Sequence, residues 1–190
     1  MSLPRSLFFA ASAFGLIGLN ASAHAAVAPQ DLVAPITEYK LYVLDNLEQF
    51  TAHSREFTEA IKAGELAKAQ SLYAPTRVYY ERIEPIAELF ADLDASIDAR
   101  EDDYENGVQD ADFTGFHRLE YGLFKQESTD GMAPFAERLM SDVEDLDQRV
   151  QALTFPPEKV VGGAAAPMEE VAATKVSGEE DRYSRTDLWD

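Results

Sequence analysis

Residues 31–63 read DLVAPITEYKLYVLDNLEQFTAHSREFTEAIKA and form a long amphipathic segment near the start of the chain. Apolar side chains recur in it at steps of three, four and seven residues: Leu32, Ile36, Tyr39, Val43, Leu47, Phe50, Phe57 and Ile61. This spacing puts them on one face of a helix. Gly64 follows directly and is a typical helix terminator. The stretch therefore predicts one long helix with a continuous apolar face.

The same periodicity continues through the rest of the chain. It predicts helices over 65–73, 75–90, about 95–102, 114–124, 132–153 and, more weakly, 158–176. Pro85 should kink or split the second of these. Strand-type alternation is almost absent, so the predicted fold class is all-α, an up-and-down bundle that resembles a four-helix bundle. The polar residues 177–190 end at Leu188-Trp189-Asp190, so we expect the domain over 27–190 to be truncated at its C-terminus.

Residues 1–26 predict a secretory signal peptide. Arg5 supplies a basic start, residues 7–19 are apolar and uncharged, and small residues at 21–25 offer cleavage sites. The apolar run is shorter than the roughly 20 residues that a membrane-spanning helix needs. We therefore expect an exported, periplasmic protein.

Composition excludes several function classes. The chain of 190 residues has 16 Lys and Arg against 35 Asp and Glu, a net charge of −19. Such a protein repels phosphate, which argues against nucleic acid as a partner. It has no cysteine, which excludes disulfides, cysteine-ligated zinc, iron–sulfur clusters and thiol catalysis. Any metal ion must be held by oxygen and imidazole.

Two helical pairs have the side chains for such a site. Glu81 and Glu84 are three residues apart on one predicted helix, and His117 and Glu120 are three apart on another. Helical bundles build carboxylate-rich metal sites from inward-facing pairs of this kind. Carboxylates with one imidazole suit iron, manganese or zinc better than copper(I). Polar segments add two further oxygen donors, Asp98 and Glu180.

The residues alone leave other readings open. Carboxylate pairs in an acidic protein are commonly solvated helix faces, and His117 lies between Phe116 and Leu119, where a buried structural histidine also fits. The sequence has no Gly-x-Ser-x-Gly, no His-Glu-x-x-His and no glycine-rich phosphate loop.

Three longer segments carry a family resemblance. Residues 115–124, GFHRLEYGLF, resemble the Gly-x-His-x-x-Glu signature of imelysin-like proteins. Residues 79–88, YYERIEPIAE, and 177–190, SGEEDRYSRTDLWD, resemble the EfeO/EfeM branch of that family, the periplasmic component of bacterial ferrous-iron uptake systems. The resemblance covers about residues 34–190, without a preceding cupredoxin-like domain, as in the short EfeM form.

The resemblance implies an exported helical protein that carries iron, as Fe²⁺ or Fe³⁺, or another divalent cation such as zinc. Its partners would be an inner-membrane ferrous-iron permease and a periplasmic haem peroxidase. Carried over by position, the implied metal ligands are Glu81, Glu84, Asp98, His117 and Glu180, with Glu120 completing the signature. We expect these side chains to converge in one oxygen-rich pocket with a single imidazole.

Two other functions stay open at this point. One is a metal-dependent peptidase, with His117 as ligand and Glu120 as base, although the chain has no second histidine-bearing motif. The other is binding of an acidic polysaccharide such as alginate, which a protein of this charge would need a cation to bridge. Of these classes, we favour a binding protein over an enzyme.

Overall fold

The computed structural model describes residues 29–154 and 183–184. Every regular element in these residues is helical, which confirms the all-α prediction. The elements are η1 (Pro29–Leu32), α1 (Val33–Lys62), α2 (Leu66–Ala87), η2 (Glu88–Phe90), α3 (Ala91–Asp98), η3 (Glu101–Asp103), η4 (Gly107–Gln109), α4 (Gly115–Glu120), η5 (Tyr121–Lys125) and α5 (Ala133–Ala152). The predicted signal peptide, the helix expected at 158–176 and Glu180 lie outside the described residues.

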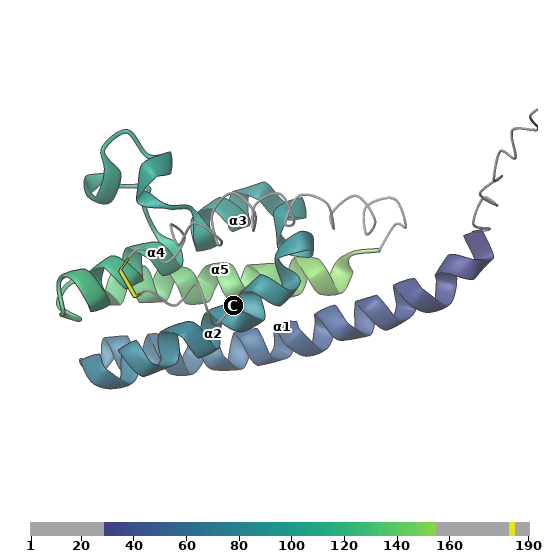
Figure 1. Ribbon diagram of the computed structural model, residues 1–190, viewed down its shortest axis with the longest axis horizontal. Helices are drawn as coiled ribbons and strands as arrows, with labels where there is room; N and C mark the ends of the chain where they lie inside the picture. Colours follow the sequence, from purple (N-terminus) through teal and green to yellow (C-terminus); the bar gives the residue numbers. More distant parts are fainter. Residues whose placement is uncertain (1–28, 155–182, 185–190) are drawn as a thin grey trace, which may run out of the picture.

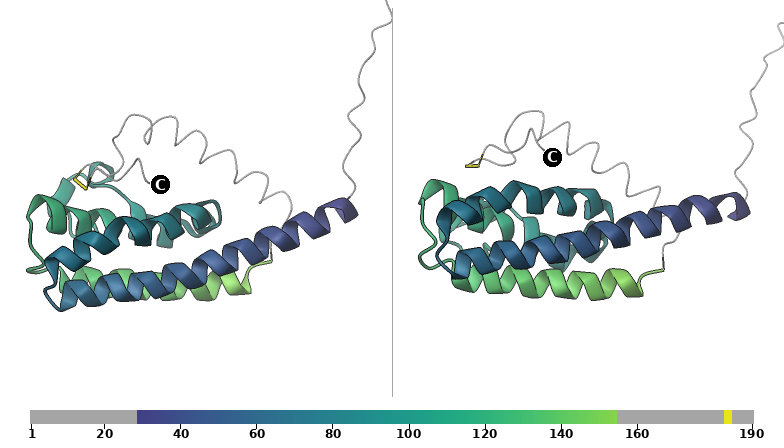
Figure 2. Two further views of the ribbon diagram at one scale, coloured as in Figure 1. Left: turned by 60° about the horizontal axis from the view of Figure 1, so that its bottom comes forward. Right: turned by 90° about the horizontal axis from the view of Figure 1, so that it is seen from below.

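The helices form an antiparallel bundle. α1 packs against α2 on one side and α5 on the other, and the short helices α3 and α4 close the remaining side against α5 (Figure 1). The N-terminal turns of α1 extend beyond the other helices (Figure 2). None of the described helices is both long enough and apolar enough to cross a membrane.

The predicted apolar face of α1 forms much of the core. Val43, Leu47, Phe50 and Phe57 are completely buried. None of the other described helices lies beside the first turns of α1, and Val33 there is 63% exposed. α1 ends at Lys62, and Gly64 then adopts a positive φ of 76°, a conformation that glycine takes without steric cost. The predicted end of this helix is thus confirmed.

α2 corrects the prediction of separate helices over 65–73 and 75–90. It is one helix, and both Pro75 and Pro85 lie inside it. A proline in a helix interior removes one hydrogen bond and costs about 3 kcal/mol. Buried side chains on both sides of Pro75, such as Tyr73 and Tyr80, pack into the same core. This burial holds the two halves in line, and Pro85 falls in the last turn, where the helix is about to end.

α3 also differs from its predicted range, because it begins at Ala91 and ends at Asp98 instead of covering 95–102. Ala99 leaves the helical conformation, with φ −59° and ψ 143°. Beyond it, the Asp103 carboxylate accepts a hydrogen bond from the Arg100 backbone N–H at 2.8 Å, which stabilises a separate turn. The early end makes Asp98 the last residue of α3, close to α2 and α4.

Candidate metal centre

A buried arginine, Arg77 of α2, lies where three of the predicted ligands meet. Its side chain is completely buried. Its Nη2 forms an ion pair with Glu81, one turn further along α2. Its Nη1 donates to Oδ1 of Asp98 at 2.7 Å and lies 3.1 Å from Nε2 of His117. Three elements of the fold therefore bring two carboxylates and one imidazole around a single guanidinium group.

His117 is oriented by contacts at both ring nitrogens. Arginine can only donate hydrogen bonds, so Nε2 of His117 faces Arg77 as an acceptor. Its Nδ1 lies 3.2 Å from Oε2 of Glu120, which can only accept when ionised. These contacts favour the neutral tautomer with the proton on Nδ1. The lone pair that a metal ion would use is then the one on Nε2, directed at Arg77.

Glu120 lies behind His117 and contacts a distant part of the chain. Its Oε1 accepts hydrogen bonds from the backbone N–H groups of Tyr183 at 2.8 Å and Ser184 at 2.6 Å. The side chain is 1% exposed. Burial raises the pKa of Glu120, and the two backbone hydrogen bonds oppose that shift. Glu120 thus connects the His-x-x-Glu signature to residues more than 60 positions away.

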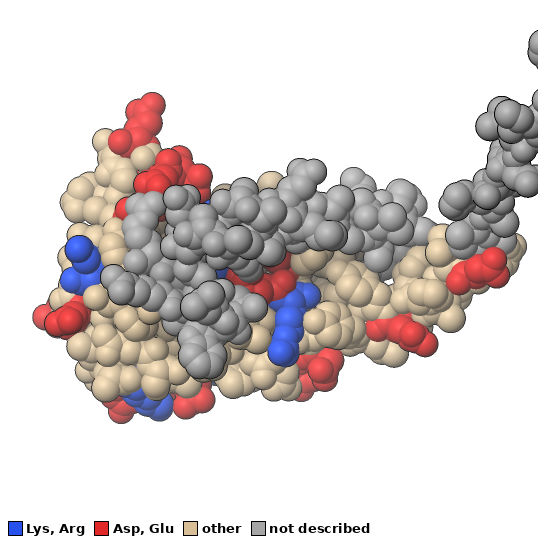
Figure 3. Space-filling model, in the orientation of Figure 1, with Lys and Arg blue, Asp and Glu red and all other residues tan. Residues whose placement is uncertain are grey.

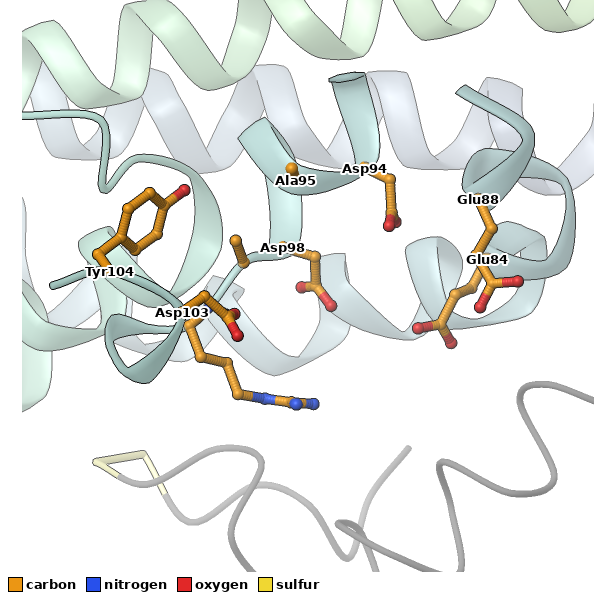
Figure 4. Close-up of a pocket in the computed structure, with 9 residues that line it drawn as sticks. Glu84, Glu88, Asp94, Ala95, Asp98, Asp103 and Tyr104 are labelled. Carbon is orange, nitrogen blue, oxygen red and sulfur yellow. The ribbon is translucent and has the colours of Figure 1, made fainter. Parts of the chain in front are cut away.

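An acidic pocket of about 390 Å³ lies next to this cluster. Asp98 belongs to both, since it contacts Arg77 and also lines the pocket. In Figure 4 the carboxylates of Asp98, Asp94 and Glu84 point into the same space. The other side chains with charges along its wall are Glu88, Asp103 and Arg100. Acidic groups are also spread over the face of the molecule in Figure 3, with fewer basic ones. This surface attracts cations and repels anions.

The predicted ligands therefore form two sets with one shared member. Glu81, Asp98 and His117 surround Arg77, whereas Glu84 lines the pocket that Asp98 also lines. Within residues 29–154 and 183–184, no three histidine or carboxylate side chains are arranged ready to hold a metal ion. Sequence reasoning missed Arg77, although its position four residues before Glu81 is the spacing of a helical ion pair.

Tyr80 supports the wall of the pocket from the core. It is completely buried, and its hydroxyl donates to Oδ1 of Asp94 at 2.5 Å. Burial raises the pKa of Tyr80 well above its usual value, and the negative charges of Asp98, Asp94 and Glu84 add to the shift. The hydroxyl therefore stays a donor and holds Asp94 in place.

The raised pKa of Tyr80 predicts a loss of stability in alkali. Its folded-state pKa lies above the unfolded value near 10, so its contribution is intact below about pH 10 and declines as pH rises further. We expect the unfolding free energy of the wild type to fall more steeply between about pH 10 and 11 than that of Tyr80→Phe, by up to about 1.4 kcal/mol per pH unit. Urea unfolding at several pH values measures the slopes. Equal slopes in wild type and Tyr80→Phe would contradict the prediction.

Comparison with a family profile and comparison with individual proteins lead to the same family. The profile of the imelysin family matches residues 35–190. The iron uptake system component EfeM of Pseudomonas syringae pv. syringae (strain B728a) is 64% identical over 176 residues, which cover 93% of this chain and 62% of EfeM. The iron uptake system components EfeO of Escherichia coli (strain K12) and Shigella flexneri are each 63% identical over 155 residues, which cover 82% of this chain and 41% of EfeO. The chain thus spans less than two thirds of the length of these relatives.

Proposed function

Because the chain belongs to the imelysin family and is of the EfeO/EfeM type, we propose that it is a periplasmic iron-binding component of a bacterial iron-uptake system. Iron is its cargo, which it delivers to an inner-membrane ferrous-iron permease that works with a haem peroxidase. The names of the relatives support the link to iron uptake. The net charge of −19 is consistent with a cation as cargo.

One observation carries the assignment of the binding site: two carboxylates and an imidazole from three helices converge on one cationic group. Glu81, Asp98 and His117 supply oxygen and nitrogen donors, a set that suits Fe²⁺ or Zn²⁺. We propose these three as the central ligands, with Glu84 joining from the pocket side of Asp98. Glu180 is a further proposed ligand, because it is three positions before Tyr183 and a chain of that length spans at most about 11 Å.

In this proposal, Arg77 is the counter-cation of the metal-free site. Buried carboxylates need a compensating positive charge, and the guanidinium supplies it to Glu81 and Asp98. A metal ion bound to Nε2 of His117 uses the lone pair that faces Arg77, so the two cations are alternatives at this position. Metal binding is then an exchange of one cation for another, and the acidic pocket beside Asp98 is the route from solvent.

The test is isothermal titration calorimetry with Zn²⁺, and with Fe²⁺ under anaerobic conditions. We expect the double variant Glu81→Gln with His117→Gln to bind at least about 100-fold more weakly than the wild type, because it lacks two of three central ligands. Glu144→Gln is the control, since this exposed carboxylate pairs only with the exposed Arg55 among the ion pairs of the described residues. Wild-type affinity in a folded double variant would exclude this site.

A further inference from the structure

We propose that Glu120 is a positioning residue that orients His117 and anchors the chain at residues 183–184, and that it does not itself bind the metal. The anchoring is independent of the proposed iron-binding function. Only the orientation of His117 toward a metal ion rests on that proposed function. The proposal changes the role of the glutamate in the His-x-x-Glu signature from ligand to support.

The first argument is the position of Glu120 relative to the imidazole ring. Its Oε2 lies 3.2 Å from Nδ1 of His117, whereas Arg77 and Asp98 lie on the side of Nε2, at 3.1 and 3.7 Å. A metal ion on Nε2 therefore has the ring between itself and Glu120. Metal-binding histidines commonly donate their other N–H group to a carboxylate, which sets the tautomer and the ring orientation. Glu120 occupies the place of that carboxylate.

The second argument is that the other oxygen of Glu120 is already engaged. Oε1 accepts from both backbone N–H groups of Tyr183 and Ser184, which uses the two lone pairs of that oxygen. A metal ion at Oε1 would have to displace both hydrogen bonds. Because hydrogen bonds to a buried carboxylate are stronger than those between neutral groups, we expect this arrangement to persist when the metal is bound.

Residues 183–184 are held by further contacts around Glu120. The Tyr183 hydroxyl donates to Oε2 of Glu101 in η3 at 2.8 Å. The Tyr183 ring packs edge-on against Tyr121, with centroids 5.4 Å apart, and Nζ of Lys125 lies 5.9 Å from the Tyr183 centroid. Three elements thus fasten a turn that is remote in sequence. Glu120 also contacts His117, so it links this turn to the imidazole.

Hydrogen exchange on the metal-free protein tests the anchor. We expect the backbone amides of Tyr183 and Ser184 to be protected in the wild type and to exchange at least about tenfold faster in Glu120→Ala, which has no acceptor. Glu120→Gln keeps a carbonyl oxygen and should retain most of the protection. Equal exchange rates in wild type and Glu120→Ala would overturn the anchor. Should Glu120→Ala fail to fold, the wild type by itself tests the anchor, because amides of Tyr183 and Ser184 that exchange as fast as those of an unfolded peptide would overturn it.

Two further measurements test the orienting role. In metal-free wild type, ¹⁵N NMR of histidine should show His117 with its proton on Nδ1. Glu120→Gln, whose amide group can place a donor opposite Nδ1, should lower the population of this tautomer, although Arg77 still favours it through Nε2. An unchanged tautomer would contradict orientation by Glu120.

In a crystal structure with Zn²⁺, we expect His117 Nε2 as a ligand and both Glu120 oxygens outside the coordination shell. A Zn–O contact of about 2 Å to Glu120 would overturn the proposal. If the wild type does not bind Zn²⁺ at all, the proposed metal site is overturned, and the hydrogen-exchange test of the anchor still applies.

Discussion

Replacing Gly115 with alanine is expected to destabilise the protein by about 3–5 kcal/mol. Gly115 has a φ of 75°, and an added Cβ would lie 2.1 Å from the backbone oxygen of Ile97 and 2.5 Å from its carbonyl carbon. Those atoms belong to the main chain of α3 and cannot rotate away as a side chain can. α4 would have to separate from α3, the helix that ends at Asp98. Urea unfolding followed by circular dichroism measures the loss.

Gly131→Ala is a matched control for this prediction. Gly131 has the same φ of 75°, but an added Cβ would meet no atom within 4 Å. We therefore expect only the cost of the positive φ, about 1 kcal/mol. A similar loss in both variants would mean that the contact between Gly115 and Ile97 contributes nothing. The same separation of α3 from α4 should weaken Zn²⁺ binding in Gly115→Ala, since it moves Asp98 away from His117.

Phe116→Ala is expected to cost about 3–5 kcal/mol, because it removes a completely buried ring from the centre of the core. Four aromatic rings surround Phe116, with centroids 6.0–6.4 Å from its own: Phe50, Phe57, Tyr73 and Tyr80. Cζ of Arg77 lies 5.9 Å from the Phe116 centroid. The same ring therefore supports both the hydrophobic core and the guanidinium at the candidate metal centre.

The control for Phe116→Ala is Leu41→Ala, at a position 63% exposed on α1. Its loss should stay within about 0.5 kcal/mol. Phe116→Leu, which keeps much of the apolar volume, should fall between the two. A loss below about 1 kcal/mol for Phe116→Ala would contradict the central position of this ring.

Much of the candidate site follows from spacing within single helices. Glu120 is three positions after His117, which brings the two side chains close enough on α4 to contact each other. Spacing was less informative for Glu81 and Glu84. Three residues correspond to a rotation of about 300° around a helix, so the two carboxylates diverge by about 60°. This offset lets Glu81 face Arg77 while Glu84 faces the pocket.

The fold, too, was predicted well where it follows from local spacing and less well elsewhere. Regular apolar periodicity predicted α1 and α5 nearly to their ends, and Gly64 marked the turn between α1 and α2. The prediction was wrong at Pro75, where a local rule favoured two helices and burial of the flanking residues produced one. It also placed α3 too late, because the acidic residues around Asp98 have no clear apolar period to mark its limits.

The amino-acid sequence by itself determined the helical class, the apolar faces of the long helices and the chemical types available for a metal site. These are properties of neighbouring residues, and a helix repeats them every three to four positions. Only the tertiary structure decided that Arg77 lies among Glu81, Asp98 and His117, and that Glu120 accepts the N–H groups of Tyr183 and Ser184. The contacts of Arg77 with Asp98 and His117, and those of Glu120 with Tyr183 and Ser184, join residues 21 to 64 positions apart. They depend on how whole helices pack, which no local spacing records.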